Sequence, residues 1–305
     1  MKNCLLILLP ALTLTACTDI RTRLTPDLLA ADTGSVIRLA AHTTQENELI
    51  TAETCAPALL PEALQNASGA EIAAGHISML LICGNPCALL ETALQMQWLP
   101  PSGAVVSLPE SACDALREGT APSAGQLDAA AETGQLPYRP ADAVLGDLIS
   151  GSGITALHTA ETSRLTLSLW DAEQQYGTLS ETACRGLALL GNRWKTFSFP
   201  CGDSVCSIRR TALHTAVTQQ DGGLCVTVSG SVSAETDDPA AAEQRLTEML
   251  TAALYETARD AGADLLFLRE YAVRGGVRTA IRCEPAEWAA MLHGAEYRVC
   301  ISVRA

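Results

Sequence analysis

The sequence predicts an α+β protein with two or three small mixed α/β domains, in which the C-terminal domain is an antiparallel sheet packed on a long helix. Three observations lead to this prediction. Strand-like and helix-like segments alternate up to residue 118, which is typical of an α/β unit. A run of β-type segments then occupies residues 195–234. The strongest amphipathic helix of the chain follows at 239–261.

The N-terminal domain is predicted at residues 18–118. Its clearest element is a helix at 86–97, because Asn85 precedes it as a cap and Pro86 takes its first position. The other elements are three strands and two helices, in chain order at 35–41 (strand), 57–66 (helix), 76–83 (strand), 104–108 (strand) and 111–117 (helix).

A linker and a middle domain are predicted at residues 119–191. Residues 118–140 are rich in Gly, Pro, Ala and Ser and lack an apolar period, so we expect a loop there. A short helix follows at 141–149. Residues 163–170 alternate leucine with polar side chains, as a half-buried strand does, and Ser180 then caps another helix.

The C-terminal domain is predicted at residues 192–305. Its long helix starts after Asp238 and places its apolar residues at a period of 3.6 on one face, at Leu246, Met249, Leu250, Ala253, Leu254 and Ala258. A hairpin turn at 221–223 separates two of the preceding strands. A helix around Trp288 and a strand at 297–303 follow the long helix.

Residues 1–17 read as a bacterial lipoprotein signal. Lys2 provides the positive charge, and the apolar run 4–14 is too short to span a bilayer, which needs roughly 20 residues. Small residues directly precede Cys17, whose thiol would accept the lipid. We expect an acidic soluble chain held on the outer face of a membrane by acyl groups such as palmitate on Cys17. The alternative is an ordinary secretory signal in which Cys17 is incidental.

The chain carries a formal charge of −14. This acidity argues against nucleic acid as a partner and against electrostatic docking onto anionic lipid. Without Cys4 and Cys17, ten cysteines remain, at Cys55, Cys83, Cys87, Cys113, Cys184, Cys201, Cys206, Cys225, Cys283 and Cys300. Outside the cytoplasm they can form disulfides, but several lie in apolar runs where a free thiol serves as a small hydrophobe.

Two cysteine pairs have alternative interpretations. Cys201 and Cys206 can close a loop as a disulfide, or join His214 and Cys225 in a zinc site, although strands would have to bring those ligands together. Cys83 and Cys87 flank a strand-to-helix turn, but three residues separate them, where thioredoxin-type motifs have two. Of these alternatives, we favour a possible Cys201–Cys206 disulfide and predict no metal site.

Catalytic motifs are missing from the sequence. We find no Gly-x-Ser-x-Gly elbow, no His-Glu-x-x-His and no Walker loop, and residues 151–153 read only as a flexible turn. His42, His76 and His158 have no ligand spacing and are interpreted as structural. The residue chemistry therefore favours a binding or assembly protein without catalytic residues or cofactor.

Three stretches follow a more specific pattern. Residues 17–23 place charged side chains directly after the lipidation cysteine. Residues 167–170 form an aliphatic strand ending in Trp, and residues 176–182, Tyr-Gly-Thr-Leu-Ser-Glu-Thr, add a turn into a helix that carries Gly186. Near the C-terminus, strands and the long helix precede the sequence Glu-Pro-Ala-Glu-Trp at 284–288.

In these stretches the chain resembles the spore germination Ger(x)C family, the lipoprotein C subunits of germinant receptors. Thr18 stands where the family has Trp, and Gly294 or Ala295 lies near the place of its second C-terminal Trp. The resemblance covers most of the mature chain in element order and little of it in identity.

The resemblance implies a non-enzymatic subunit of a nutrient germinant receptor. Such a subunit would lie on the outer face of the spore inner membrane and assemble with the integral-membrane A and B subunits. The alternative is a solute-binding lipoprotein of a transporter, which would need two lobes around a polar cleft. A zinc or thiol enzyme is a third class.

Overall fold

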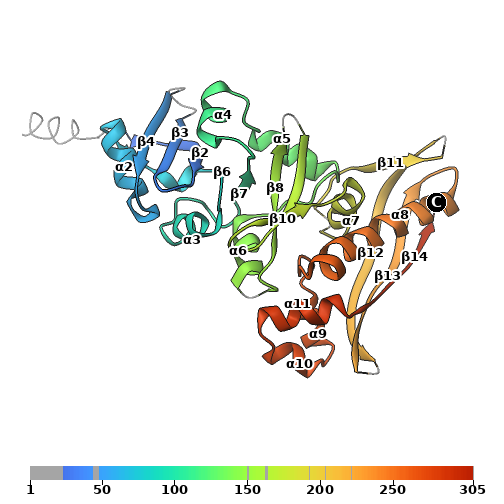
Figure 1. The fold of residues 1–305 in the computed structure, drawn as a ribbon. Coiled ribbons are helices and arrows are strands. Elements are labelled where there is room, and N and C mark those ends of the chain that lie inside the picture. Colours follow the sequence, from blue (N-terminus) through green and yellow to red (C-terminus); the bar gives the residue numbers. More distant parts are fainter. Residues whose placement is uncertain are drawn as a thin grey trace, which may run out of the picture.

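The computed structural model describes most of the chain beyond the predicted signal. The described residues are 23–43, 48–149, 151–161, 164–191, 193–202, 204–220 and 222–304. Cys17 and the rest of the predicted lipoprotein signal lie outside them. The described chain forms an elongated molecule, with an eight-stranded sheet and its helices at one end and a four-stranded sheet with a long helix at the other (Figure 1).

The larger sheet is parallel at its centre and antiparallel at both ends. Its strands follow the order β10 (Gln175–Thr178), β9 (Arg164–Trp170), β8 (Thr155–Glu161), β7 (Ala104–Ser107), β6 (Met79–Cys83), β2 (Pro26–Asp32), β3 (Ile37–Thr43) and β4 (Glu48–Thr54). A separate parallel pair joins β1 (Arg23–Leu24) to β5 (Glu71–Ile72).

Helices cover both faces of this sheet, so its central strands are buried on both sides. One face packs against α2 (Leu60–Ser68), α3 (Cys87–Gln95) and α6 (Ala141–Ile149). The other packs against α4 (Ala112–Glu118) and α5 (Ala124–Glu132). Strands buried in this way read as continuous apolar runs, as β6 and β7 do.

The region around α5 differs from the sequence prediction of a loop at 118–140. Ser123 and Gln126 form a capping box: the Ser123 hydroxyl accepts from the Gln126 N–H at 3.2 Å, and the Gln126 side chain accepts from the Ser123 N–H at 2.8 Å. The alanines that follow favour helix, and Leu127 is buried. The low apolar content that suggested a loop belongs to a short helix whose exposed side carries Gly125, Gln126, Asp128 and Ala129.

The smaller sheet has the order β11 (Phe197–Cys201), β12 (Ser204–Gln220), β13 (Gly223–Glu235) and β14 (Glu296–Arg304). One face packs on α8 (Pro239–Leu254), which Asp238 caps by accepting from the Ala241 N–H at 3.0 Å. The α+β prediction is confirmed. The sheet is mixed, because the chain returns through a helical crossover and β14 joins β13 in parallel.

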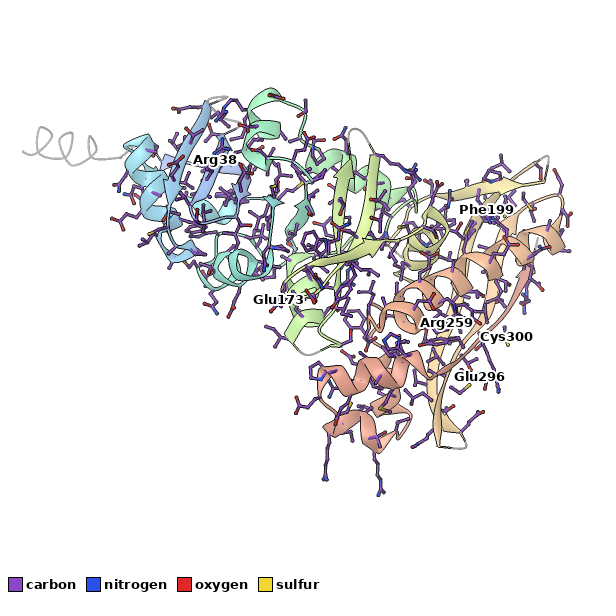
Figure 2. The ribbon with its side chains drawn as sticks, viewed as in Figure 1. Arg38, Glu173, Phe199, Arg259, Glu296 and Cys300 are labelled. Atoms are coloured by element: carbon purple, nitrogen blue, oxygen red, sulfur yellow. The ribbon has the colours of Figure 1, made fainter. Side chains whose placement is uncertain are left out.

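The outer face of the smaller sheet has no helix on it in Figure 1. Glu296 and Cys300 lie on β14, the edge strand, and both are exposed (Figure 2). Between β13 and β14 the chain forms a π-helical turn (Tyr255–Arg259) and three short helices, α9 (Leu268–Arg274), α10 (Arg278–Arg282) and α11 (Pro285–His293).

The two ends of the molecule meet through α7 (Glu181–Gly191), which packs on α8. Leu179, Leu187 and Leu265 share one apolar cluster with side chains of β9 and α8. The larger sheet runs through both the predicted N-terminal range 18–118 and the range 119–191. The division of the chain into domains stays a prediction.

Candidate functional site

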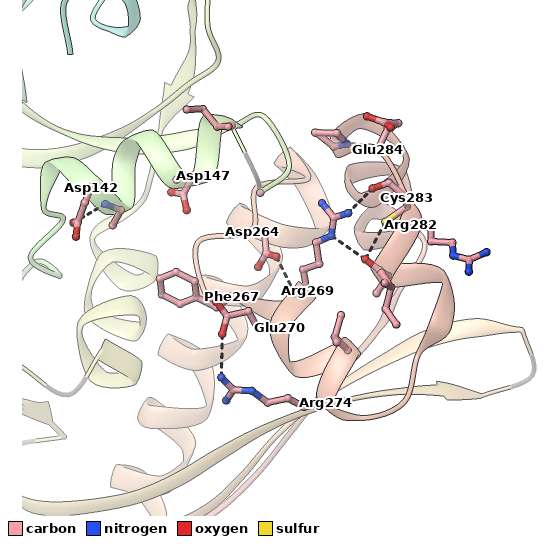
Figure 3. Close-up of a pocket in the computed structure, with 18 residues that line it drawn as sticks. Asp142, Asp147, Asp264, Phe267, Arg269, Glu270, Arg274, Arg282, Cys283 and Glu284 are labelled. Carbon is pink, nitrogen blue, oxygen red and sulfur yellow. Dashed lines mark hydrogen bonds and ion pairs between the residues drawn. The ribbon is translucent and has the colours of Figure 1, made fainter. Parts of the chain in front are cut away.

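A groove of about 970 Å³ lies where the two ends of the molecule meet (Figure 3). One wall comes from α6 and the residues after it, 142–151. The other comes from the loop before α9, from α9 and α10, and from the start of α11. We call this cavity the junction groove.

Asp264 organises the second wall of the groove. Its carboxylate accepts hydrogen bonds from the backbone N–H groups of Leu268 (2.6 Å) and Arg269 (2.9 Å), which cap the start of α9. It also accepts from the indole N–H of Trp288 at 2.8 Å, and the Asp264 N–H donates to the Ser152 hydroxyl at 3.0 Å. Burial raises the pKa of Asp264 against these donors, which favour the ionised form.

A buried ion pair supports the opposite wall. The Arg139 guanidinium donates from Nη2 to the Asp147 carboxylate, which also accepts from the Thr155 hydroxyl at 2.9 Å. Arg139 reaches the other wall through its Nη1, which donates to the Leu265 carbonyl at 3.5 Å. Burial raises the pKa of Asp147 to about 6, although Arg139 and Thr155 oppose this effect.

Arg269 fixes α10 against α9. Its Nε donates to the Ala280 carbonyl at 2.9 Å and its Nη2 to the Cys283 carbonyl, as the dashed lines in Figure 3 show. Glu270 and Arg274 form an exposed ion pair along α9 at 3.1 Å. The short helices are thus held by side-chain bonds to backbone carbonyls.

Apolar side chains stand exposed around the groove. Among the described residues, nine large hydrophobic side chains are exposed, and four of them line this cavity: Ile149 (65%), Phe267 (51%), Val273 (41%) and Ile281 (59%). Phe267 has a φ of 57°, in the left-handed region that residues other than glycine seldom adopt. Clustered exposed apolar side chains are typical of a surface that docks another molecule.

The groove offers little for catalysis. The described residues contain no group of three or more His, Cys, Asp or Glu side chains placed to hold a metal ion. The carboxylates of Asp147 and Asp264 accept hydrogen bonds from donors of the protein itself. Within the described part of the chain, no helix has the length and apolarity needed to cross a bilayer.

Comparisons with known proteins identify the fold. No family model matches the chain, and no curated protein matches its sequence. Among solved structures, the crystal structure of the GerBC protein aligns with a TM-score of 0.59, covering 90% of this chain and 96% of that chain. The fold is Ger(x)C-like. Sequence identity is 10%, so the likeness lies in the fold.

The residues that carried the sequence resemblance have clear places in the Ger(x)C-like fold. Trp170 ends β9 and is buried. The turn at 176–182 leads from β10 into α7, where Gly186 faces α8, and Trp288 is the fully buried donor to Asp264. Trp170 packs in the core of the larger sheet, whereas Gly186 lies at the contact of α7 with α8 and Trp288 supports a wall of the junction groove.

Cys201 and Cys206 are free thiols in the structure, both buried in the core under α8. In the β11–β12 register Cys201 lies opposite Ser204 and Cys206 opposite Phe199, so the two cysteines are diagonal neighbours. Diagonal positions are about 7–8 Å apart, farther than the usual Cα separation in a disulfide. The register gives the possible disulfide no support, and it stays a prediction.

The zinc alternative does not fit the sheet. Cys206 faces the core, whereas His214 is exposed. His214 pairs across the strands with Ser229 of β13, which lies on the same face of the sheet as Cys225. The redox alternative is weakened because burial raises the pKa of the Cys83 thiol, which disfavours the reactive thiolate. The side chain of Cys87 is not among those that the structure describes.

Sequence reasoning missed the residues that build the groove. Arg139, Asp147 and Asp264 are single charged residues in ordinary surroundings. Asp147 meets Arg139 and Thr155 eight residues away on either side, whereas Asp264 meets Ser152 from 112 residues away. Ser152 was noted only as part of a turn. The one usable signal was Trp288, which the family resemblance singled out before its partner was known.

Proposed function

We propose that the chain is a lipid-anchored subunit of a nutrient germinant receptor and acts in spore germination. The observation that carries this proposal is the Ger(x)C-like fold, which extends over 90% of the chain. The sequence resemblance in the lipobox, the turn into α7 and the 284–288 motif supports it independently. The name GerBC follows the naming pattern of the Ger(x)C family, with B in the variable position.

The lipid anchor is a separate part of the proposal. Cys17 would carry the acyl groups and hold the chain on the outer face of the spore inner membrane. Confinement to the membrane plane raises the effective concentration of the protein near membrane partners. We propose that these partners are the integral-membrane A and B subunits, and that the role is non-enzymatic.

The junction groove is the surface we assign to this assembly. Ile149, Phe267 and Ile281 expose apolar area beside it, and the buried Arg139–Asp147 and Asp264–Trp288 contacts hold its walls in place. Rigid walls reduce the entropy lost when a partner binds.

Deletion of the gene tests the receptor role. We expect spores without it to lose the response to at least one nutrient, and a wild-type copy to restore it. A Cys17→Ala copy should restore less, and the protein should no longer incorporate a labelled fatty acid. An unchanged response to every nutrient in a broad panel would refute the receptor role, whatever the state of Cys17.

A further inference from the structure

A second cavity, of about 320 Å³, lies next to the junction groove and shares Ala143 and Phe267 with it. Three parts of the chain line it: residues 131–143, the end of α7 with Arg193 and Trp194, and residues 265–271 together with Thr215 of β12. We call it the Trp194 pocket. Its volume is at the lower end of the range of small-molecule sites, roughly 300–1,000 Å³.

Two buried donors in this pocket have no partner. Arg139 is only 6% exposed, and although its Nη1 and Nη2 donate to Leu265 and Asp147, its Nε has no hydrogen-bond partner among the described residues. The indole Nε1 of Trp194 is also buried and unpaired. Both atoms only donate, and a buried unpaired donor is costly, so both favour a ligand with acceptor atoms.

The charges around the pocket favour an anion. The chain has 34 acidic and 20 basic residues, yet the residues lining this pocket include two arginines and neither Asp nor Glu. Asp147 balances the charge of Arg139, whereas Arg193 makes no ion pair with any described residue and lies over the Tyr138 ring, 5.7 Å from its centroid. Arg193 therefore supplies the uncompensated positive charge.

Apart from the two arginines and Thr215, the lining carries no polar side chain other than those of its aromatic residues. Its apolar side chains are Leu136, Leu187, Leu190, Leu265 and Leu266, and its rings come from Tyr138, Trp194, Phe267 and Tyr271. A fully hydrated inorganic anion would gain little from this surface. With no carboxylate in the lining, the ammonium group of an amino acid would lack an ionic partner.

We propose that the Trp194 pocket binds a small organic anion, a carboxylate attached to an apolar body. Its carboxylate faces Arg193, small side-chain shifts bring the unpaired N–H groups of Trp194 and Arg139 within its reach, and its apolar body packs among the leucines and rings. The proposal is read from the pocket itself and does not depend on the receptor role. Such binding suits either a receptor subunit or a solute-binding lipoprotein, so the germination test above and the binding test below can fail separately.

Calorimetric titration of the purified full chain in detergent tests the pocket, with phenylacetate as the probe. We expect saturable binding of phenylacetate, about tenfold or more weaker binding of phenylacetamide, and weaker binding of phenylalanine. Trp194→Phe keeps a ring while removing the donor, and Arg193→Gln removes an exposed charge; each should weaken phenylacetate binding about tenfold.

Arg278→Gln is the matched control, because Arg278 is exposed on α10 and lines neither cavity. It should leave the affinity unchanged. Thermal melts of each variant, with and without phenylacetate, show whether the fold is intact and whether the ligand stabilises it. Absence of binding at millimolar phenylacetate, equal affinity for the amide, or insensitivity to both pocket substitutions would each overturn the proposal.

Discussion

At the scale of single residues, the junction depends on two carboxylates that are almost completely buried, Asp147 and Asp264. Each is surrounded by donors from other elements, and each has a raised pKa because burial outweighs those donors. The partners of a buried ionised carboxylate offset only part of the free energy lost when its charge leaves water. The stability of the fold therefore depends on pH through both residues.

The pH dependence of Asp147 can be measured directly. Its pKa rises from 3.8 to about 6 on folding, so the folded state binds a proton more tightly than the unfolded state between those values. The resulting stabilisation is fully present below about pH 4 and is lost as the pH rises through 6. We expect Asp147→Asn to remove this component, up to about 1.4 kcal/mol per pH unit, from the slope of unfolding free energy against pH.

Urea unfolding at a series of pH values from 4 to 7 provides the measurement. Asp142→Asn is the control, because it removes an exposed carboxylate from the same helix and leaves the buried Arg139–Asp147 pair in place. Equal slopes in wild type and Asp147→Asn would contradict the assignment of this titration to Asp147.

Trp288 is the second residue whose role can be isolated. It is fully buried, and its indole N–H donates to the Asp264 carboxylate at 2.8 Å. Trp288→Phe keeps most of the packing and removes a hydrogen bond to a charged group, so we expect a loss of about 1.5–3 kcal/mol in unfolding free energy. A loss below about 0.5 kcal/mol in chemical denaturation would show that the bond contributes little.

At the scale of elements, α7 and α8 approach each other closely at Gly186. A Cβ built on Gly186 would overlap the backbone carbonyl of Met249 and approach the Ala253 side chain at 2.8 Å. Backbone cannot move aside as a flexible side chain does, so glycine at this position sets the distance between the two helices.

Gly186→Ala should therefore destabilise the protein by about 1–3 kcal/mol or more, because α7 must shift away from α8. Gly191→Ala at the end of the same helix meets no atom within 4 Å and is the control, expected to be neutral or slightly stabilising. Thermal and urea unfolding of both variants compare them. Similar stabilities would show that the helices separate easily.

Elements whose signals are local could be predicted from the sequence. The helices starting near Ser180 and Asp238 can be predicted because their caps and apolar periods lie within a few residues of the sequence. The helix expected at 86–97 forms at Cys87–Gln95, but the expected cap is wrong: Pro86 precedes the helix without a side-chain cap, and the Asn85 amide donates to the Ala172 carbonyl at 2.8 Å. The strand partners were not predicted, since the parallel pairing of β14 with β13 depends on a crossover through several helices. The groove was missed for the same reason: Asp264 meets Ser152 and Trp288 only after the chain has folded.

At the scale of the whole molecule, four of the nine large hydrophobic side chains that are exposed among the described residues gather at one place, the junction groove. Ile281 is 59% exposed there, whereas Val205 is 64% exposed on the smaller sheet and lines none of the cavities described. The two residues form a matched pair for testing whether the groove contacts the membrane subunits of the proposed receptor.

Ile281→Glu should lower the yield of membrane subunits that co-purify with the tagged chain at least severalfold, because a charge replaces exposed apolar area at the proposed contact. Val205→Glu should leave the yield unchanged, and both variants should melt near the wild-type temperature. If both substitutions reduce the yield equally, or neither does, the assembly surface lies elsewhere.

The parallel strand β14 also determines when, during biosynthesis, the edge of β13 is protected from pairing with other chains. It is made after every other described element, yet it covers the edge of β13, and its Val299, Ile301 and Val303 pack on the core beneath α8. Until β14 has been synthesised and has paired, β13 presents unpaired backbone groups to other chains. A nonsense mutation in the codons of β14 would thus cause aggregation or proteolysis before any loss of binding.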